Sequence, residues 1–386
     1  MLFKDIIGLE NIKKHLTSSV EKGRVPHAQL FVGAEGSGTL PMAIAYAQYV
    51  LCGNLNGENE DTNQACNLKC NHLSHPDLHF AFPVATSDRI KSKPISDDFL
   101  KEWRAFIKQN PYANLYQWMQ FLDIEKKQGL IGKNEALEIA KKLSLKSFEG
   151  GYKVMLIWMA DKMNIAAANK LLKLIEEPPN KTLLILIAEN EEQIIKTILS
   201  RCQVLHFPKV SEENIIKHLI DGKQIEHKLA IKIAHQSNGN WNKALQLAKQ
   251  DNEQPIFEVW FIQWIRAAFK AKGNASVVEE LINWSNEISK TSRETQKQFL
   301  QYCLHFFRQA MLLNYKADKL VYLETKSPTF DLKKFAPFIH SGNIIAINET
   351  LNEAIYHIER NGSAKIILLD ISIKLTRLLH AKEAQL

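Results

Sequence analysis

Apolar runs and amphipathic stretches alternate in the middle of the chain. Residues 154–159 and 183–188 are apolar throughout, which is typical of strands buried on both faces of a parallel sheet. Residues 165–175 between them place leucines on one helical face, and Glu176-Glu177-Pro178-Pro179 ends that helix. The order strand, helix, strand predicts a βαβ unit of the kind found in nucleotide-binding sheets.

The first fifty residues predict a related arrangement. Residues 11–22 are expected to form a helix, because their apolar positions recur every four residues, and a glycine follows them. Residues 29–32 predict a short strand and residues 42–51 a second helix. A glycine-rich loop joins this strand to this helix.

The remainder of the chain is helical in pattern. Residues 209–250 predict three short helices, residues 251–255 a polar hinge, and residues 256–386 a bundle that includes long amphipathic helices. We therefore expect an α/β domain over residues 1–208, a small helical lid over 209–250 and an all-α domain over 256–386.

Residues 84–150 are more than an α/β core of this kind needs. Aromatic residues recur there at helical spacing, with Trp103 and Phe106 in one predicted helix and Trp118 and Phe121 in the next. Such rings are core residues more often than ligand-stacking surfaces, so we expect them to be buried. We interpret residues 84–150 as an insertion, and its role does not follow from the sequence.

Composition bounds the class of protein. The chain has 386 residues, enough for two or three domains, and its 45% hydrophobic and 24% charged content is that of a globular protein. It contains no apolar run near the ~20 residues of a membrane span and begins without a secretory pattern. The net charge is +7 and the lysines are spread along the chain, so the charge permits contact with nucleic acid without requiring it. The five cysteines, an odd number, argue against a disulfide framework. We expect a cytoplasmic protein.

The glycine-rich loop has the position of a phosphate-binding loop but lacks its chemistry. A working loop, G-x-x-x-x-G-K-[ST], wraps phosphates with backbone amides, reaches them with lysine and holds magnesium with the hydroxyl. Here Gly33, Gly36 and Gly38 remain, but Thr39 replaces the lysine and Leu40 the hydroxyl residue. The loop is therefore a degenerate phosphate-binding loop, or simply a glycine-rich turn.

A cysteine and histidine cluster follows the helix at residues 42–51. Zinc takes four soft or borderline ligands in a tetrahedron, often as pairs two to four residues apart. Cys52, Cys66 and Cys70 supply three, and His72 is better spaced than His75 to complete the site. The alternative is a decayed module with free thiols and no metal.

Several segments resemble the clamp-loader branch of the AAA+ ATPases. The most specific are ANKLLKLIEEPP at residues 168–179 and TILSRCQ at residues 197–203. IIGLENIKKHL with GRVPHAQLFVG, at residues 6–33, and GNWNKAL, at residues 239–245, support the resemblance. It implies an AAA+ domain with a helical lid and a C-terminal collar that joins subunits. The family also carries a four-cysteine zinc module where residues 52–75 stand here.

The resemblance narrows at the metal-binding acidic pair of these ATPases. Trp158 and Met159 stand in its place, so the chain resembles most the delta-prime subunits of the bacterial DNA polymerase III clamp loader. With Thr39 and Leu40 also changed, the resemblance implies a pseudo-ATPase that neither binds nor hydrolyses ATP.

Other positions of the nucleotide site are altered as well. Glu189 falls about where a polar sensor of the γ-phosphate stands, and a carboxylate there would repel phosphate. Asn242 replaces the arginine of the lid. Asp161, two residues after Met159, is expected to cap or position the following helix.

Ser200-Arg201-Cys202 resembles the SRC motif of clamp loaders, whose arginine reaches into the ATP site of a neighbouring subunit. Such an arginine finger acts because its charge meets the negative charge of the transferring phosphoryl group. The alternative for Arg201 is a structural salt bridge at a helix start.

The resemblance thus implies a non-hydrolysing subunit of a replicative clamp loader. Its partners would be delta and gamma/tau subunits in a pentameric ring, the sliding clamp indirectly, and primer–template DNA, with no membrane and a nucleoid-associated location. Zinc would be the one cofactor. Two alternatives remain, an ATP-hydrolysing motor subunit of the gamma/tau type and a zinc-dependent nucleic-acid adaptor on an ATPase-like scaffold.

Overall fold

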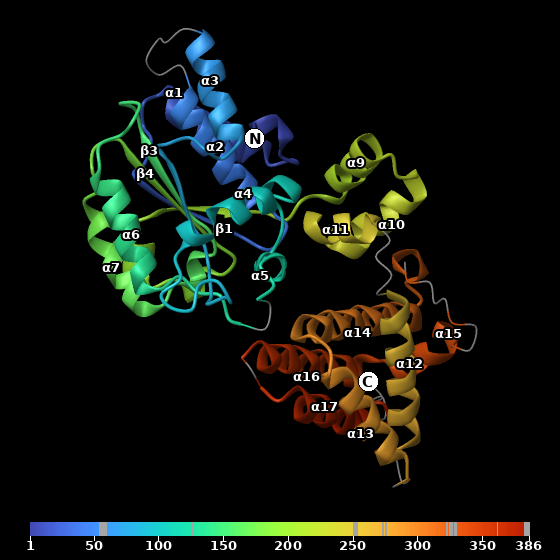
Figure 1. Cartoon of the computed structure of the whole chain (residues 1–386). Coiled ribbons are helices and arrows are strands. Elements are labelled where there is room, and N and C mark those ends of the chain that lie inside the picture. Colours follow the sequence, from blue (N-terminus) through green and yellow to red (C-terminus); the bar gives the residue numbers. More distant parts are fainter. Residues whose placement is uncertain are drawn as a thin grey trace. The chain divides into compact units, whose positions relative to one another are not determined.

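The structure, a computed structural model, describes two compact units, Met1–Lys249 and Gln250–Leu386 (Figure 1). It describes all residues except 54–59, 125–126, 250–253, 272–273, 275, 322, 324–326, 328–329, 361 and 382–386. Most of the predicted hinge at 251–255 and part of the predicted zinc module at 52–75 therefore lie outside the described residues. Within the described residues, none of the helices combines the length and the apolar character needed to cross a membrane.

A five-stranded parallel sheet forms the centre of the first unit. Its order is β2-β3-β4-β1-β5, and every neighbouring pair is parallel. The strands are β1 (Ala28–Gly33), β2 (Leu78–Ala81), β3 (Lys153–Ile157), β4 (Thr182–Ala188) and β5 (Gln203–Phe207). The predicted α/β class is confirmed.

The two edge strands, β2 and β5, are absent from the sequence prediction. The three central strands are buried along their whole length, whereas β5 is exposed at Gln203 and His206. An edge strand borders solvent on one side, so it tolerates the polar residues that hide its pattern. Residues 197–202, predicted to close the βαβ unit, contain the end of a short helix, and β5 begins at Gln203.

Helices cover both faces of the sheet (Figure 1). Along each strand, side chains alternate between the faces, as Leu30 and Phe31 do in β1. One face packs against α6 and α7, and the other against α1, α2, α4 and α5. The helices before the lid are α1 (Glu10–Glu21), α2 (Thr39–Cys52), α3 (Glu60–Asn71), α4 (Leu100–Gln109), α5 (Leu115–Phe121), α6 (Lys133–Ser144), α7 (Ile165–Glu176) and α8 (Lys196–Leu199).

The lid consists of α9 (Glu212–Lys223), α10 (His227–Ser237) and α11 (Trp241–Ala248), close to the predicted helices. Its apolar side chains, such as Ile215, Ala234 and Trp241, form one cluster with Ile7 and Tyr112 of the sheet domain. The lid and the sheet domain therefore share a small core and belong to the same compact unit.

The second unit is all helical over its described residues, as predicted. Its core is aromatic: the indole rings of Trp264 and Trp284 stack with centroids 4.9 Å apart, and the Trp264 indole N–H donates to the Ser372 hydroxyl at 2.8 Å. The helices are α12 (Gln254–Lys270), α13 (Ser276–Ser289), α14 (Arg293–Asn314), α15 (Leu332–Phe335), α16 (Ser341–Glu359) and α17 (Ala364–Leu378).

Candidate functional site

The glycine-rich loop lies where the sequence predicts it, between β1 and α2. Gly38 precedes the first turn of α2 with a positive φ of 94°, and Gly36 has a φ of 72°. The N-terminus of α2 can still attract an anion through its backbone N–H groups. Its first two side chains are Thr39 and Leu40, so the helix offers neither a lysine ammonium nor a metal-binding hydroxyl at the expected positions.

The lid closes directly on this loop. The Trp241 backbone N–H donates to the Gly36 carbonyl at 3.2 Å. A Cβ atom on Gly36 would lie 2.0 Å from the Asn240 Oδ1 atom, so only glycine permits this approach. The lid is thus held directly against the backbone of the loop.

A polar network joins the loop, the lid and the insertion. The Asn242 side-chain amide donates to Glu35 Oε1 at 3.1 Å and to Gln117 Oε1 at 2.8 Å, and its Oδ1 accepts from Asn110 Nδ2 at 2.7 Å. Asn114 Nδ2 also donates to Glu35 Oε1, at 3.1 Å. Asn242, at the position where the resemblance places the lid arginine, is therefore buried within this network.

Little space remains where a nucleotide would lie. The cavity beside the loop has a volume of about 20 Å³, enough for about one water molecule. Small-molecule sites in proteins are larger by more than tenfold, at roughly 300–1,000 Å³. We call this cavity the remnant pocket; its walls include Glu35, Leu40, Tyr112, Trp158, Met159 and Glu189.

Carboxylates line the remnant pocket where a phosphate site needs cations. Glu35 lies in the loop itself, and Glu189 follows the end of β4. Lys243 of the lid is close to Glu35, but burial lowers the pKa of its ammonium, against the opposing effect of the Glu35 carboxylate. The electrostatics of the pocket therefore disfavour a triphosphate.

Trp158 and Met159 turn the expected metal position into core. Both side chains are buried, and the Trp158 ring contacts Trp103 and Phe106 of the insertion, with centroids 5.1 Å and 6.5 Å apart. Trp118 and Phe121 belong to the same aromatic cluster, and the prediction of burial is confirmed for Trp103, Phe106 and Trp118, whereas Phe121 is partly buried and packs against the core. Met159 has a φ of 55°, an unusual conformation for a side chain of its size.

Asp161 does not cap the following helix, which corrects that half of the prediction that it caps or positions the helix. Asn164 is the N-cap of α7, and its side chain accepts from the Ala167 backbone N–H at 2.8 Å. Asp161 lies in a short 3-10 turn, Ala160–Lys162, and pairs with Lys162 at 2.9 Å. A turn separates Asp161 from α7, which leaves the first free amides of the helix to Asn164.

Arg201 lies at the opposite end of the sheet from the remnant pocket. It follows α8 and precedes β5, whereas the glycine-rich loop follows the far end of the parallel neighbour β1. The five residues of β5 span about 16 Å at ~3.3 Å per residue. Arg201 therefore does not reach the pocket of its own chain.

The immediate contacts of Arg201 are local and exposed. Its Nε pairs with Glu176 Oε1 at 2.6 Å, and its Nη1 donates to the Thr197 carbonyl at 2.9 Å and to Ser200 Oγ at 3.2 Å. The side chain of Arg201 is 38% exposed and that of Glu176 is 43% exposed. Cys202 is half-buried, and burial raises the pKa of its thiol to about 11.

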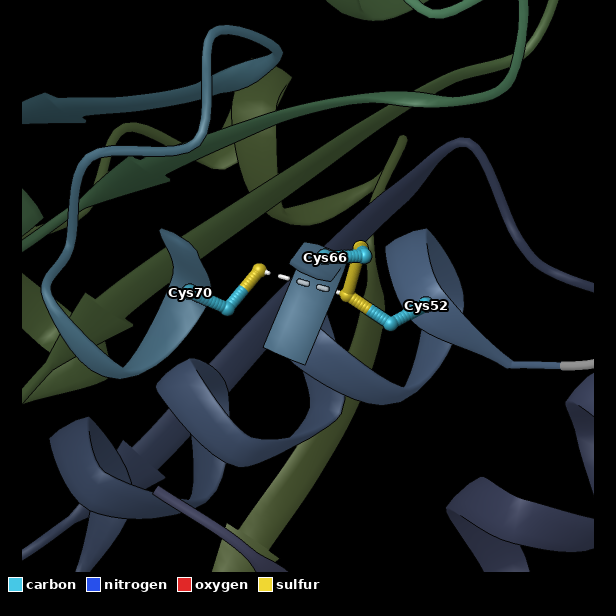
Figure 2. Close-up of side chains that lie close together, drawn as sticks. All are labelled: Cys52, Cys66 and Cys70. Carbon is cyan, nitrogen blue, oxygen red and sulfur yellow. Dashed lines mark hydrogen bonds between the residues drawn. A yellow bond between two sulfur atoms is a disulfide. The ribbon is translucent and has the colours of Figure 1, made fainter. Parts of the chain in front are cut away.

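The predicted zinc cysteines do come together (Figure 2). Cys66 and Cys70 lie one turn apart on α3, so their wide spacing is that of a helix, and Cys52 is the last residue of α2. Cys52 and Cys66 form a disulfide, which corrects the expectation of either a zinc site or free thiols, and Cys70 Sγ lies 3.5 Å from Cys52 Sγ. Burial raises the pKa of the Cys70 thiol to about 12.

A histidine also lies beside the cysteines, and it is His75. The ligand atoms of Cys66, His75 and Glu149 lie within 4.8 Å of one another, whereas His72 belongs to neither such group among the described residues. His75 is buried, its Nδ1 accepts from the Asp77 backbone N–H at 3.1 Å, and its Nε2 lies 3.0 Å from Glu149 Oε2. With the disulfide reduced, Cys52, Cys66 and Cys70 offer three thiol ligands that suit zinc, and His75 lies beside Cys66 in a second group with Glu149.

Comparison with known proteins identifies the family. The family model described as "DNA polymerase III, delta subunit" matches residues 8–211, more than half of the chain. The chain belongs to this family. The resemblance to delta-prime subunits is thereby confirmed at the level of the family.

Similar proteins include two subunit types. The delta-prime subunit of DNA polymerase III from Bacillus subtilis (strain 168) is 29% identical over 241 residues, 62% of this chain and 59% of that protein. The tau subunit from the same organism is 27% identical over 256 residues, 64% of this chain and 37% of that protein. The aligned part of the chain thus spans less than two thirds of either relative.

Among solved structures, a DNA polymerase III gamma subunit-related protein from Thermotoga maritima covers 95% of this chain and 99% of its own, with a TM-score of 0.39 and 12% identity.

Glu35 and Tyr112 are among the pocket residues that sequence reasoning missed. Glu35 is visible in the sequence as an acidic residue inside the glycine-rich loop, and that charge could have been noted. Tyr112 follows Asn110-Pro111, which the sequence marks only as a helix break. No local signal indicates that this break reaches the nucleotide position.

Proposed function

We propose that this chain is a non-hydrolysing, delta-prime-type subunit of a bacterial DNA polymerase III clamp loader. The observation that carries the proposal is the remnant pocket, which keeps the position of a nucleotide site but has a volume of about 20 Å³. The side chains at the four positions that would hold phosphate and metal are Thr39, Leu40, Trp158 and Met159. None of them carries a positive charge or a carboxylate, and the Thr39 hydroxyl stands one position before the hydroxyl that binds magnesium in a working loop.

The proposed assembly assigns a role to each part of the chain. Residues 1–208 and the lid over 209–250 would form the ATPase-like part, and residues 256–386 would form the collar. The collar would join delta and gamma/tau subunits in a pentameric ring that opens the sliding clamp and places it on primer–template DNA. The work would be done in the cytoplasm, at the nucleoid.

Arg201, with Ser200 and Cys202, would supply an arginine finger to the ATP site of a neighbouring subunit. Its position at the far end of β5 supports an action in trans, because its own pocket lies at the other end of the sheet. The ion pair with Glu176 is exposed, and exposed pairs contribute only ~0–1 kcal/mol. A neighbouring phosphate could therefore displace Glu176 at little cost.

Zinc would have a structural role in the reduced protein. Cys52, Cys66, Cys70 and His75 would hold it, and Glu149, whose Oε2 lies 3.0 Å from His75 Nε2, would be an outer partner of the histidine. The ion would join the end of α2 to α3. No catalytic step is assigned to it.

Calorimetry with ATP and magnesium tests the central claim. The isolated chain should show neither micromolar ATP binding nor ATP turnover. Restoring one or two of the four altered positions by mutation is not expected to restore ATP binding, because all four differ at once. Clear binding with hydrolysis would favour the motor alternative. Co-purification from cell extract with identification of the partners tests the assembly, and capture of nucleic-acid proteins unrelated to replication would favour the adaptor alternative.

A further inference from the structure

The segment Asn110–Ala113 of the insertion enters the remnant pocket. The Tyr112 side chain is 8% exposed, and its hydroxyl accepts a hydrogen bond from the Ile7 backbone N–H at 3.1 Å. Its ring lies against the glycine-rich loop, 3.2 Å from where a Cβ on Gly38 would be. Pro111 and Ala113 also line the pocket.

The same segment holds the lid. Tyr112 belongs to the apolar cluster that contains Ile215, Ala234 and Trp241 of the lid. Two residues earlier, Asn110 Nδ2 donates to Asn242 Oδ1 at 2.7 Å. Four consecutive residues therefore contact the loop, the N-terminal segment and the lid.

These contacts are the ones that a bound ligand would need to keep the lid closed. A ligand between two parts of a protein stabilises the closed arrangement when it contacts both in that arrangement. A segment of the same chain does this without dissociating, because its effective concentration is fixed by covalent linkage. Burial also raises the pKa of Tyr112 to about 12, so the phenol stays neutral.

We infer that Asn110–Ala113 is an internal substitute for a nucleotide, which locks the lid onto the sheet domain in a ligand-independent closed state. This gives the insertion a role that goes beyond the proposed function. The inference rests on the proposed function in one respect, namely that the remnant pocket binds no nucleotide.

Hydrogen exchange of the full chain, read by mass spectrometry, tests the lock. In Tyr112→Ala, amides of residues 212–248 should exchange on the order of a hundredfold faster, because a buried ring is lost from the contact that closes the lid. Strands β1 and β4 should keep their protection. Tyr112→Phe removes only the hydroxyl and should speed lid exchange a few-fold, about the effect of one hydrogen bond.

Phe106→Ala is the matched control. Phe106 is an equally buried aromatic residue of the insertion, but it packs against Trp103, Trp118 and Trp158 rather than the lid. It should loosen the insertion without selective opening of the lid. If Tyr112→Ala does not fold, Tyr112→Phe and Asn242→Ala decide the matter, since Asn242 anchors the lid side of the contact.

Two results would overturn the inference. Unchanged lid exchange in Tyr112→Ala, or in both Tyr112→Phe and Asn242→Ala, would show that the segment does not hold the lid. Slower lid exchange of the wild type with millimolar ATP or ADP and magnesium would show that a nucleotide does, and would also overturn the closed-pocket part of the proposed function. The first result leaves the proposed function intact.

Discussion

The indole ring of Trp158 lies beside that of Trp103, with ring centroids 5.1 Å apart. Trp158 stands just after β3, at the position where a related ATPase would hold its metal, and Trp103 is in α4 of the insertion. The contact makes this position part of the hydrophobic core. Once an aromatic cluster has formed there, an acidic residue would be placed among rings instead of beside a metal ion.

Trp158→Asp should therefore destabilise the protein and restore no ATP hydrolysis. Removal of a buried tryptophan side chain costs about 3–5 kcal/mol. The introduced carboxylate would add the cost of burying a charge. The free energy of unfolding, from urea denaturation followed by circular dichroism, measures the loss. Trp158→Phe keeps a ring and should cost less, about 1–2 kcal/mol; ATP turnover in Trp158→Asp would contradict this account.

The fold was predictable where burial is complete and not at its margins. The central strands β3 and β4 are buried along their length, so their apolar runs stand out in the sequence. β5 carries polar residues because it lies at an edge, and β2 has only four residues. The hydrophobic pattern of a strand is clear only when neighbouring elements cover it on all sides. An edge strand is covered on fewer sides, so its pattern is weak.

The site was predictable where identity alone decides the chemistry. Thr39 in place of the lysine and Leu40 in place of the metal-binding hydroxyl residue remove those two groups from their positions whatever the fold. The role of Tyr112 depends on a tertiary contact with Ile7, 105 positions away, which local spacing cannot reveal. Spacing favoured His72 over His75. In the structure α3 ends at Asn71, just before His72, and the chain that follows brings His75 close to Cys66.

Glu135 should make stability depend on pH. Burial raises the pKa of its carboxyl from 4.5 to about 7, opposed by the hydrogen bond from the Ser96 backbone N–H at 2.6 Å and by the charge of Lys142, while Asp97 raises it further. Between these values the folded state holds the proton and the unfolded state does not. The contribution of Glu135 to the free energy of unfolding is therefore fully present below about pH 4.5. It is lost as the pH rises to about 7, by about 3 kcal/mol at most.

Glu135→Gln isolates this contribution. Glutamine keeps an oxygen that can accept from the Ser96 N–H but does not titrate. Urea denaturation of both proteins from pH 4.5 to 8 should show the wild type losing stability relative to the variant as the pH rises. The comparison with the variant is needed because burial also lowers the pKa of His79, and that shift makes stability rise with pH, opposite to the effect of Glu135. Parallel curves would show that Glu135 does not titrate in this range.

The cysteine cluster should hold one zinc ion per chain when the protein is purified under reducing conditions without chelators. Three thiolates and one imidazole satisfy the four ligands of a structural site. Cys66→Ser should lose the metal and lower the melting temperature, because a structural ion contributes directly to folding. Elemental analysis and thermal denaturation measure the two effects.

A matched pair of histidine variants tells which nitrogen completes the zinc site. His75→Ala should lower zinc content, and His72→Ala should leave it unchanged, because His72 is exposed and lies outside the described ligand groups. The reverse result would assign the site to His72. If the protein contains no zinc, and thiol titration of unfolded, non-reduced samples detects only Cys70, Cys202 and Cys303, the result would support the Cys52–Cys66 disulfide instead.

Arg201 should matter only in the assembled clamp loader, and the structure supplies the control. Arg201→Ala and Glu176→Gln each break the same ion pair. Because the pair is exposed, either change should alter the stability of the isolated chain by less than about 1 kcal/mol. If Arg201 is a finger, only Arg201→Ala should slow ATP hydrolysis, and only in the reconstituted ring.

The effect at the interface that Arg201 faces should be large, since a trans arginine can contribute roughly a thousandfold or more to turnover. The total ATPase rate will fall only in part if other subunits hydrolyse ATP at other interfaces, and clamp loading should suffer more. Arg201→Lys should rescue poorly, because lysine cannot make the planar two-pronged contact. Gel filtration must show that all three variants assemble before DNA-stimulated ATPase and clamp-loading rates are compared. Equal losses in Arg201→Ala and Glu176→Gln would assign Arg201 to the salt bridge, and wild-type loading by an assembled Arg201→Ala ring would remove the finger altogether.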